Sequence, residues 1–191
     1  MKKLTFTVPV LFVLGTLQFG CATVSHDTAR AWPLVNGGFE SSVLHEGWSL
    51  HVYGAQPEVT LDTNVRHEGR QSLRIKADEP SDTALGQELW LQPGRWYRLR
   101  GWVRTEGLDP LGSPVCGTFQ VQIPVGRPGG ILADGRDHPG TNDWTEEILY
   151  FTPPDDGLTR ISIFFCGYGK GTGTAWLDQI TLEEMKTPTG K

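Results

Sequence analysis

The segment from Gly86 to Thr105 most constrains what this chain can fold into, because it reads as two strands joined by a tight turn. Pro93-Gly94 supplies the fixed φ and the positive φ of a type II turn. Beyond the turn the residues alternate, with Tyr97, Leu99, Gly101 and Val103 on one side and Arg98, Arg100, Trp102 and Arg104 on the other. This pattern predicts a strand that is buried on one face and presents a flat ring among hydrogen-bond donors on the other.

Similar short runs recur from residue 35 onward, and Gly, Pro and Asp separate them. The chain holds 24 glycines and 13 prolines, and no stretch shows sustained helical spacing. The predicted strands are 47–53, 57–62, 71–77, 85–91, 96–104, 116–123, 144–152, 159–166 and 174–183. Strands at this spacing predict an all-β sandwich or barrel. The Gly/Pro-rich stretch 124–143 is predicted to be a long loop.

The N-terminal region is typical of an export signal. A basic start precedes an apolar stretch over residues 4–19, and Gly20-Cys21-Ala22 follows. We predict a signal peptide over 1–20, with Cys21 as a bacterial lipoprotein attachment site. Plain cleavage near Ala22 and an uncleaved anchor are the alternatives. A tether over 21–34, one domain over 35–184 and a disordered tail over 185–191 complete the expected organisation, for a secreted protein or an outer-membrane or cell-envelope lipoprotein.

The charge balance restricts the partners. The chain has 17 basic and 22 acidic residues, for a net charge of −5. A mildly acidic protein has no broad attraction to nucleic acid or to an anionic membrane. We therefore expect no nucleic-acid partner, membrane contact only through a lipid anchor, and a monomer.

Cys116 and Cys166 are candidates for a disulfide, because an exported protein can oxidise them. By alternation both face outward, one at the start of its strand and the other at the end of its strand. Antiparallel pairing of the two strands would bring them together and oppose Gln120 to Ser162. The alternative is two free thiols that serve as small apolar residues.

Several short motifs follow one another in a characteristic order. They are Asn36-Gly-Gly-Phe-Glu40, Gly47-Trp48, His67 to Ile75, Tyr97 to Thr105, Trp144-Thr145 and Thr174 to Leu182. The ordered set resembles the carbohydrate-binding modules of families 4 and 9, within the galactose-binding-like jelly rolls, over residues 35–184. The resemblance implies a jelly-roll β-sandwich of two antiparallel sheets that binds a polysaccharide or oligosaccharide.

The resemblance also implies a structural calcium ion. Its ligands would be the carbonyl of Gly38, the carboxylates of Glu40 and Asp178, and the carbonyls of Glu68 and Gln71. Calcium prefers several hard oxygen ligands of these kinds. The alternative is that the two carboxylates accept hydrogen bonds from backbone amides without a metal.

In such modules one sheet face binds the glycan. Alternation assigns to that face Arg98, Arg100, Trp102, Gln120, Gln122 and Phe164, with Glu88 and Trp90 on the adjacent strand and Glu146 outward on 144–152. A ring stacks on a pyranose while polar groups bond its hydroxyls. The alternative for each Trp is a partly covered residue under a loop. The arginines hint at an acidic glycan, although strand-face arginines are often only solvated.

Catalysis is not expected from this sequence. Asp134, Asp137 and His138 could mimic a metal or acid–base cluster, but surrounding Gly and Pro favour a solvated loop. No evident carboxylate pair or nucleophile motif is present. We predict non-catalytic carbohydrate binding, with no catalytic residues. The alternatives are a structural or protein-interaction envelope lipoprotein on the same fold and, further off, a jelly-roll lyase or hydrolase.

Overall fold

The computed structural model describes residues 34–44 and 46–185. The predicted signal peptide, Cys21 and all but the last residue of the predicted tether lie outside these residues, as do residues 186–191. Within the described ranges the protein is all-β, and no helix could span a membrane. The strands are β1 (Ser49–Gly54), β2 (Glu58–Asp62), β3 (Ser72–Trp90), β4 (Trp96–Asp109), β5 (Val115–Gln122), β6 (Ile131–Asp134), β7 (Gly140–Phe151) and β8 (Leu158–Met185).

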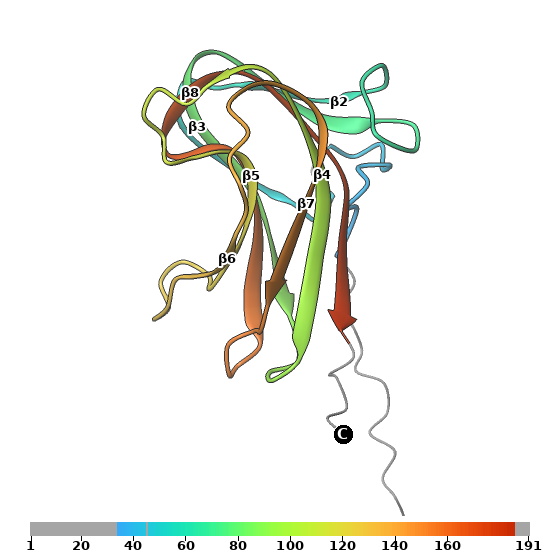
Figure 1. The fold of residues 1–191 in the computed structure, drawn as a ribbon, viewed down its shortest axis with the longest axis vertical. Helices are drawn as coiled ribbons and strands as arrows, with labels where there is room; N and C mark the ends of the chain where they lie inside the picture. The colour runs from blue at the N-terminus through green and yellow to red at the C-terminus, as the bar shows by residue number, and fades with distance from the viewer. Residues whose placement is uncertain (1–33, 45, 186–191) are drawn as a thin grey trace, which may run out of the picture.

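The strands form two antiparallel layers that face each other across one hydrophobic core (Figure 1). The front sheet has the order β1, the second half of β3 (81–90), the first half of β8 (158–171), β5 and β6. The back sheet has the order β2, the first half of β3 (72–77), the second half of β8 (172–185), β4 and β7. This is the β-sandwich that the sequence predicts.

Two strands belong to both sheets. β3 covers the predicted strands 71–77 and 85–91, and β8 covers 159–166 and 174–183. Both bend between the layers where their mutual pairing shifts register, between Ala77 and Ala84 of β3. Figure 1 shows β8 passing through one layer and ending in the other. The sequence predicted separate strands because Gly and Asp residues at the bends resemble turn signals.

The alternation of β4 is confirmed, because Tyr97, Leu99 and Val103 are buried and the arginines between them are not. Gly101 completes the inward side. A Cβ atom at Gly101 would collide with the ring of Phe119 from β5. The two sheets therefore lie so close at this position that a residue without a side chain is required.

The predicted loop 124–143 is partly wrong. It contains β6, which pairs with β5, and the first residues of β7, which pair with the end of β4. Both are edge strands, and edge strands need little hydrophobic alternation because only one neighbour and one face hold them. The Gly/Pro-rich sequence therefore concealed them.

The disulfide between Cys116 and Cys166 is present, and these residues are direct partners across β5 and β8. The predicted opposition of Gln120 to Ser162 is also confirmed. The predicted outward orientation of the cysteines is wrong, because both are buried in the main core. Gly117, at φ 62°, interrupts the alternation of β5 beside Cys116.

Candidate functional site

The predicted ligand residues are divided between the two sheets, so the expectation of one shared face is not met. Arg98, Arg100, Trp102 and Glu146 lie on the outer side of the back sheet, on β4 and β7. Trp90, Gln120, Gln122 and Phe164 lie on the front sheet. Glu88 and Trp90 are exposed opposite buried Leu89, as predicted, but their strand pairs with β1 and β8 and not with β4. Alternation gives the face of a strand but not the sheet to which the strand belongs.

The arginines of the back sheet are paired with carboxylates. Arg98 bonds Glu183 at 2.6 Å, Arg100 bonds Glu146, and Arg104 bonds Asp143 at 3.0 Å. These pairs are partly exposed and leave no arginine of this face with unbalanced charge. The hint of an acidic glycan therefore loses its basis, and this face has the character of a solvated network of ion pairs.

Trp102 faces away from the core, as predicted, but another ring covers it. The imidazole of His67 stacks on the indole with a centroid distance of 3.8 Å and an interplanar angle of 15°. Trp144 contacts the same imidazole edge-on at 5.7 Å. The face of the indole that a sugar would need is thus partly occupied by the loop before β3, which corresponds to the alternative left open for the tryptophans.

The front sheet carries a groove with a volume of about 450 Å³. Its lining comes from β1, β3, the last residue of β5, the loop after β5, and the first half of β8. The lining residues are His51, Tyr53, Asp82, Ala84, Glu88, Gln122, Val125, Arg160, Ser162, Phe164 and Tyr168. The floor combines an apolar part, made by Ala84 and Phe164, with a polar part. Such a mixture suits a ligand with both an apolar face and hydroxyl groups.

Tyr168 is held in place at the edge of this groove. Its ring packs against Phe164 at 5.6 Å, and its hydroxyl accepts a hydrogen bond of 2.6 Å from Gln122. Its backbone has φ 58°, a left-handed conformation that is uncommon for a tyrosine. The residue is still 60% exposed. A fixed and exposed ring is the usual stacking surface for a sugar.

Asp82 lies beneath this turn. Burial raises the pKa of its carboxyl above the ordinary value, although the amides of Gly169 and Tyr168 act on the carboxylate in the opposite direction. Those two amides belong to the turn that carries the Tyr168 ring. Asp82 therefore ties the turn of β8 to β3 and helps to fix the edge of the groove.

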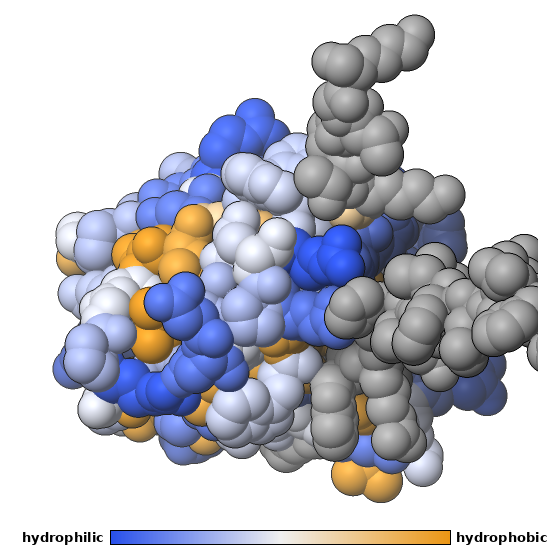
Figure 2. Space-filling view, turned by 90° about the horizontal axis from the view of Figure 1, so that it is seen from below, coloured by the Kyte–Doolittle hydropathy of each residue, from blue (hydrophilic) through white to orange (hydrophobic). Residues whose placement is uncertain are grey.

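The surface seen in Figure 2, outside its grey atoms, carries hydrophobic residues in small patches among hydrophilic ones. Several of the exposed apolar side chains belong to aromatic residues, among them Tyr53, Trp90 and Tyr168 on the front sheet. Isolated rings among polar groups favour ligands that are themselves mixed in polarity.

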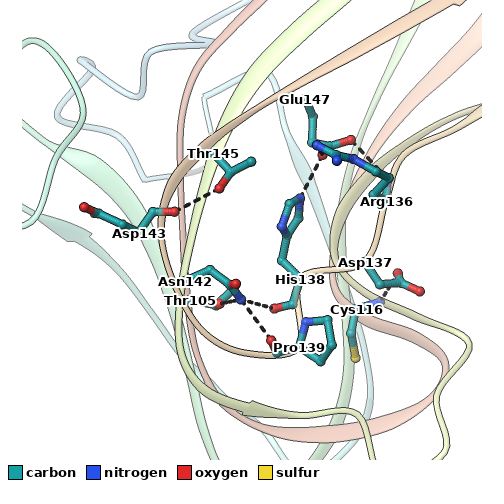
Figure 3. A network of polar contacts seen from close by, with 10 residues as sticks. All are labelled: Thr105, Cys116, Arg136, Asp137, His138, Pro139, Asn142, Asp143, Thr145 and Glu147. Atoms are coloured by element: carbon teal, nitrogen blue, oxygen red, sulfur yellow. Dashed lines mark hydrogen bonds and ion pairs between the residues drawn. The ribbon is translucent and has the colours of Figure 1, made fainter.

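The three residues of the suspected acid–base cluster have different partners, and Figure 3 shows two of them, Asp137 and His138. Asp134 accepts a hydrogen bond from Gln120, Asp137 accepts one from the amide of Cys116, and His138 lies 2.8 Å from Glu147. The prediction of a solvated loop is wrong for His138, which is buried. Residues 134–138 instead form hydrogen bonds with β5 and β7.

Glu147 of β7 is the residue to which Arg136 and His138 of this segment bond. It is 4% exposed and accepts hydrogen bonds from the backbone and side chain of Arg136 as well as contacting His138. Burial by itself would raise the pKa of this carboxyl, but the hydrogen bonds from His138 and Arg136 outweigh burial and lower it. Since Leu149 and Phe151 face inward, the same alternation places Glu147 inward, so the sequence contained this signal.

The two carboxylates that were predicted to bind calcium accept hydrogen bonds from nitrogen donors. Glu40 accepts hydrogen bonds from the backbone and Nε of Arg70, and Asp178 accepts them from the amides of His67, Glu68 and Gln179. The Gln71 amide donates to the carbonyls of Phe39 and Ser41.

Within the described residues no group of three or more His, Cys, Asp or Glu is arranged for a metal. Glu40 and Asp178 therefore accept hydrogen bonds from backbone amides, as in the alternative without a metal, and calcium binding stays a prediction.

The sequence interpretation missed most of the groove. Arg160 and Ser162 share the outward side of β8 with Phe164, and this alternation was visible from buried Ile161 and Ile163. Tyr53 gave a weaker signal, because β1 is exposed on the side of Tyr53 and only partly buried on the other. Tyr168 gave none, because its position depends on the bend of β8.

No family model and no curated protein matches the sequence. Among solved structures, the chain is similar to TmCBM61 in complex with β-1,4-galactotriose, with a TM-score of 0.57 and 18% identity over 82% of this chain and 100% of that one. A CBM4 structure gives a TM-score of 0.56 and 18% identity over 80% of this chain and 99% of that one.

A third similar structure is the enzymatically active domain of tailspike protein 4 from bacteriophage CBA120, with a TM-score of 0.57 and 17% identity over 78% of this chain. The chain spans only 21% of the length of that tailspike structure. At these identities the likeness concerns the fold. The described residues therefore form a β-sandwich of the carbohydrate-binding-module type.

Proposed function

We propose that this protein binds a polysaccharide or oligosaccharide without catalysis, through the groove on the front sheet. The observation that carries the proposal is the groove itself, in which the fixed ring of Tyr168 stands beside a floor of Phe164, Ser162 and Arg160. A sugar can stack its CH face on the ring and bond its hydroxyls to the polar floor.

The carboxylates of the groove support a non-catalytic role. Asp82 is engaged by the amides of the Tyr168 turn, and Glu88 lies 3.7 Å from the Arg160 guanidinium. Glycoside hydrolysis instead needs two carboxyl groups placed across the scissile bond, one of them able to donate a proton. The fold shared with carbohydrate-binding modules points in the same direction.

Affinity electrophoresis tests the proposal. We expect retardation of the protein in gels containing at least one of β-glucan, xylan, β-1,4-galactan or pectin. Tyr168→Ala should weaken binding by up to about 10-fold, because a stacked ring contributes of the order of 0.5–1.5 kcal/mol. Tyr150→Ala, which removes a similarly exposed ring from the back sheet, serves as the matched control and should bind as the wild type does.

Absence of retardation on every polysaccharide would contradict carbohydrate binding. Equal losses from the two tyrosine variants would contradict the choice of the front sheet. Release of reducing ends from any of the four polysaccharides would contradict the non-catalytic role.

We further propose that the protein is exported and that Cys21 carries a lipid, on the strength of the N-terminal sequence alone. The buried disulfide supports an oxidising compartment. Labelling cells with a radioactive fatty acid should mark the wild type and leave Cys21→Ala unlabelled. Labelling of both would show that another residue is acylated, and labelling of neither would favour simple cleavage.

Structural calcium remains a proposal of its own. Binding would require the Glu40 carboxylate to release Arg70, and the site joins the N-terminal segment to the loop before β3. We expect calcium added after EDTA treatment to raise the melting temperature, because an ion that binds only the folded state stabilises it. Polysaccharide affinity should not change, since the site lies outside the groove. An unchanged melting temperature would contradict the proposal.

A further inference from the structure

The floor of the groove contains a continuous chain of hydrogen bonds that crosses three strands. Nε of Arg160 donates to Oγ of Ser162 at 3.2 Å, and this hydroxyl donates to Oε1 of Gln122 at 2.8 Å. Nε2 of Gln122 donates to Oε1 of Gln120 at 2.9 Å, and Nε2 of Gln120 donates to Oδ1 of Asp134 at 2.8 Å. Every bond therefore runs in the same direction, from a cation to an anion.

This direction has an electrostatic reason. A chain of aligned hydrogen bonds polarises its members, and a positive group at the donor end with a negative group at the acceptor end favours that alignment. Reversing the Gln122 amide would place its oxygen against Oε1 of Gln120. Reversing the Gln120 amide would place its NH2 group against that of Gln122 and its oxygen against Asp134. The charges at the two ends of the chain thus decide which atom each amide presents to the groove.

Gln120 is the central member of the chain. It is 0% exposed, so a ligand in the groove cannot touch it. Its Oε1 also accepts the hydroxyl hydrogen of Tyr168, at 3.3 Å. Gln120 therefore orients both groups that rise from it into the groove, the amide of Gln122 and the hydroxyl of Tyr168.

We propose that Gln120 is a positioning residue of the groove, which together with Asp134 fixes the hydrogen-bonding pattern offered to the carbohydrate; this inference rests on the proposed function. Both N–H groups of Gln122 and the only hydroxyl hydrogen of Tyr168 are consumed within the network. These residues can then only accept hydrogen bonds from a ligand. Within this chain of bonds the free donors belong to the Arg160 guanidinium, whose Nη1 lies 3.7 Å from the Glu88 carboxylate. A sugar bound against the chain is expected to place a hydroxyl hydrogen at Gln122 or Tyr168 and an acceptor oxygen at Arg160.

The first test reverses one bond of the chain and then restores it. Gln120→Glu places two carboxylates against one another at residues 120 and 134, and we expect affinity for the most strongly retarding polysaccharide of the panel to fall about 10-fold or more. The double variant Gln120→Glu with Asp134→Asn gives the new carboxylate an amide donor and should recover affinity to within about 3-fold of the wild type. Asp143→Asn, an acidic residue of the back sheet, is the matched control and should have no effect. Recovery that fails while the fold is intact would overturn the proposal.

The second test leaves Gln120 unchanged and substitutes two residues that bond to the glutamine side chains. Ser162→Ala and Tyr168→Phe remove atoms that meet only through Gln122 and Gln120. We expect about a 10-fold loss of affinity from each and a similar loss from the double variant, because the first change already releases the shared amides. Losses that multiply would show independent contacts and would overturn the network.

The same double-mutant cycle can be measured as shifts of the denaturation midpoint, without any polysaccharide. It distinguishes failure of the hydrogen-bond network from failure of the proposed carbohydrate binding. Non-additive shifts of the denaturation midpoint together with no retardation by any polysaccharide would contradict the proposed function and retain the network. Additive shifts together with clear retardation would contradict the network and retain the function.

Discussion

Replacing both Cys116 and Cys166 by alanine is expected to lower the melting temperature by roughly 10 °C. The disulfide closes a loop with a sequence separation of 50 residues. Restricting a loop of that size in the unfolded chain corresponds to about 4 kcal/mol at 25 °C. For a domain of this size each kcal/mol shifts the melting temperature by about 2–4 °C. Differential scanning calorimetry of the double variant under oxidising conditions measures the shift.

The disulfide joins β5 to β8 just before the part of β8 that carries Tyr168. A reducing agent offers a second test of its contribution. Wild-type protein in reducing agent should lose thermal stability and approach the double variant, which itself should not respond to the reducing agent. A melting temperature within about 2 °C of the wild type would contradict the expected contribution.

Glu147→Gln is expected to cost roughly 2 kcal/mol of unfolding free energy at neutral pH, because a buried donor left without its acceptor typically costs about 1–3 kcal/mol. The amide of glutamine keeps one oxygen but cannot accept from both Arg136 and His138 as a carboxylate does. Its NH2 group would also face donors. Denaturant unfolding measures the difference. Glu146→Gln, which alters the half-exposed neighbour paired with Arg100, is the matched control and should cost less than about 1 kcal/mol.

This variant also has a pH signature. Because the pKa of Glu147 is lowered in the folded protein, its carboxylate contributes stability that is complete above its ordinary pKa near 4.5. That contribution disappears as the pH falls through the lower, folded value. The stability difference between wild type and Glu147→Gln should therefore be largest at neutral pH and shrink below pH 4.5. A difference that stays constant into the acid range would assign the effect to packing and not to charge.

The sequence predicted the elements of this fold well because alternation is a local property. The inward residues of β4 and the opposition of Gln120 to Ser162 follow directly from counting along the chain. The ordered motifs predicted two packed antiparallel sheets, and the structure has them. The disulfide followed from the same counting, although the burial of its cysteines did not.

The candidate site was harder to predict because it depends on which strands share a sheet. Trp102 and Gln120 both face away from the core, yet the bends of β3 and β8 place their strands on opposite layers. The position of the Tyr168 ring depends on the left-handed backbone of Tyr168 itself. This residue lies inside a strand whose continuity is evident only in three dimensions. No local pattern reports the path of the chain between two layers.

The course of β8 has a consequence for how the protein is made. Its first half lies between β3 and β5 and its second half between β3 and β4, so it is the central strand of both layers. A growing chain that has not reached residue 158 lacks the middle of each sheet, and its completed strands have only part of their final neighbours. Cooperative folding must then wait until almost the whole described chain has left the ribosome. With the export proposed above, such late closure would keep the chain unfolded and competent for transport across a membrane.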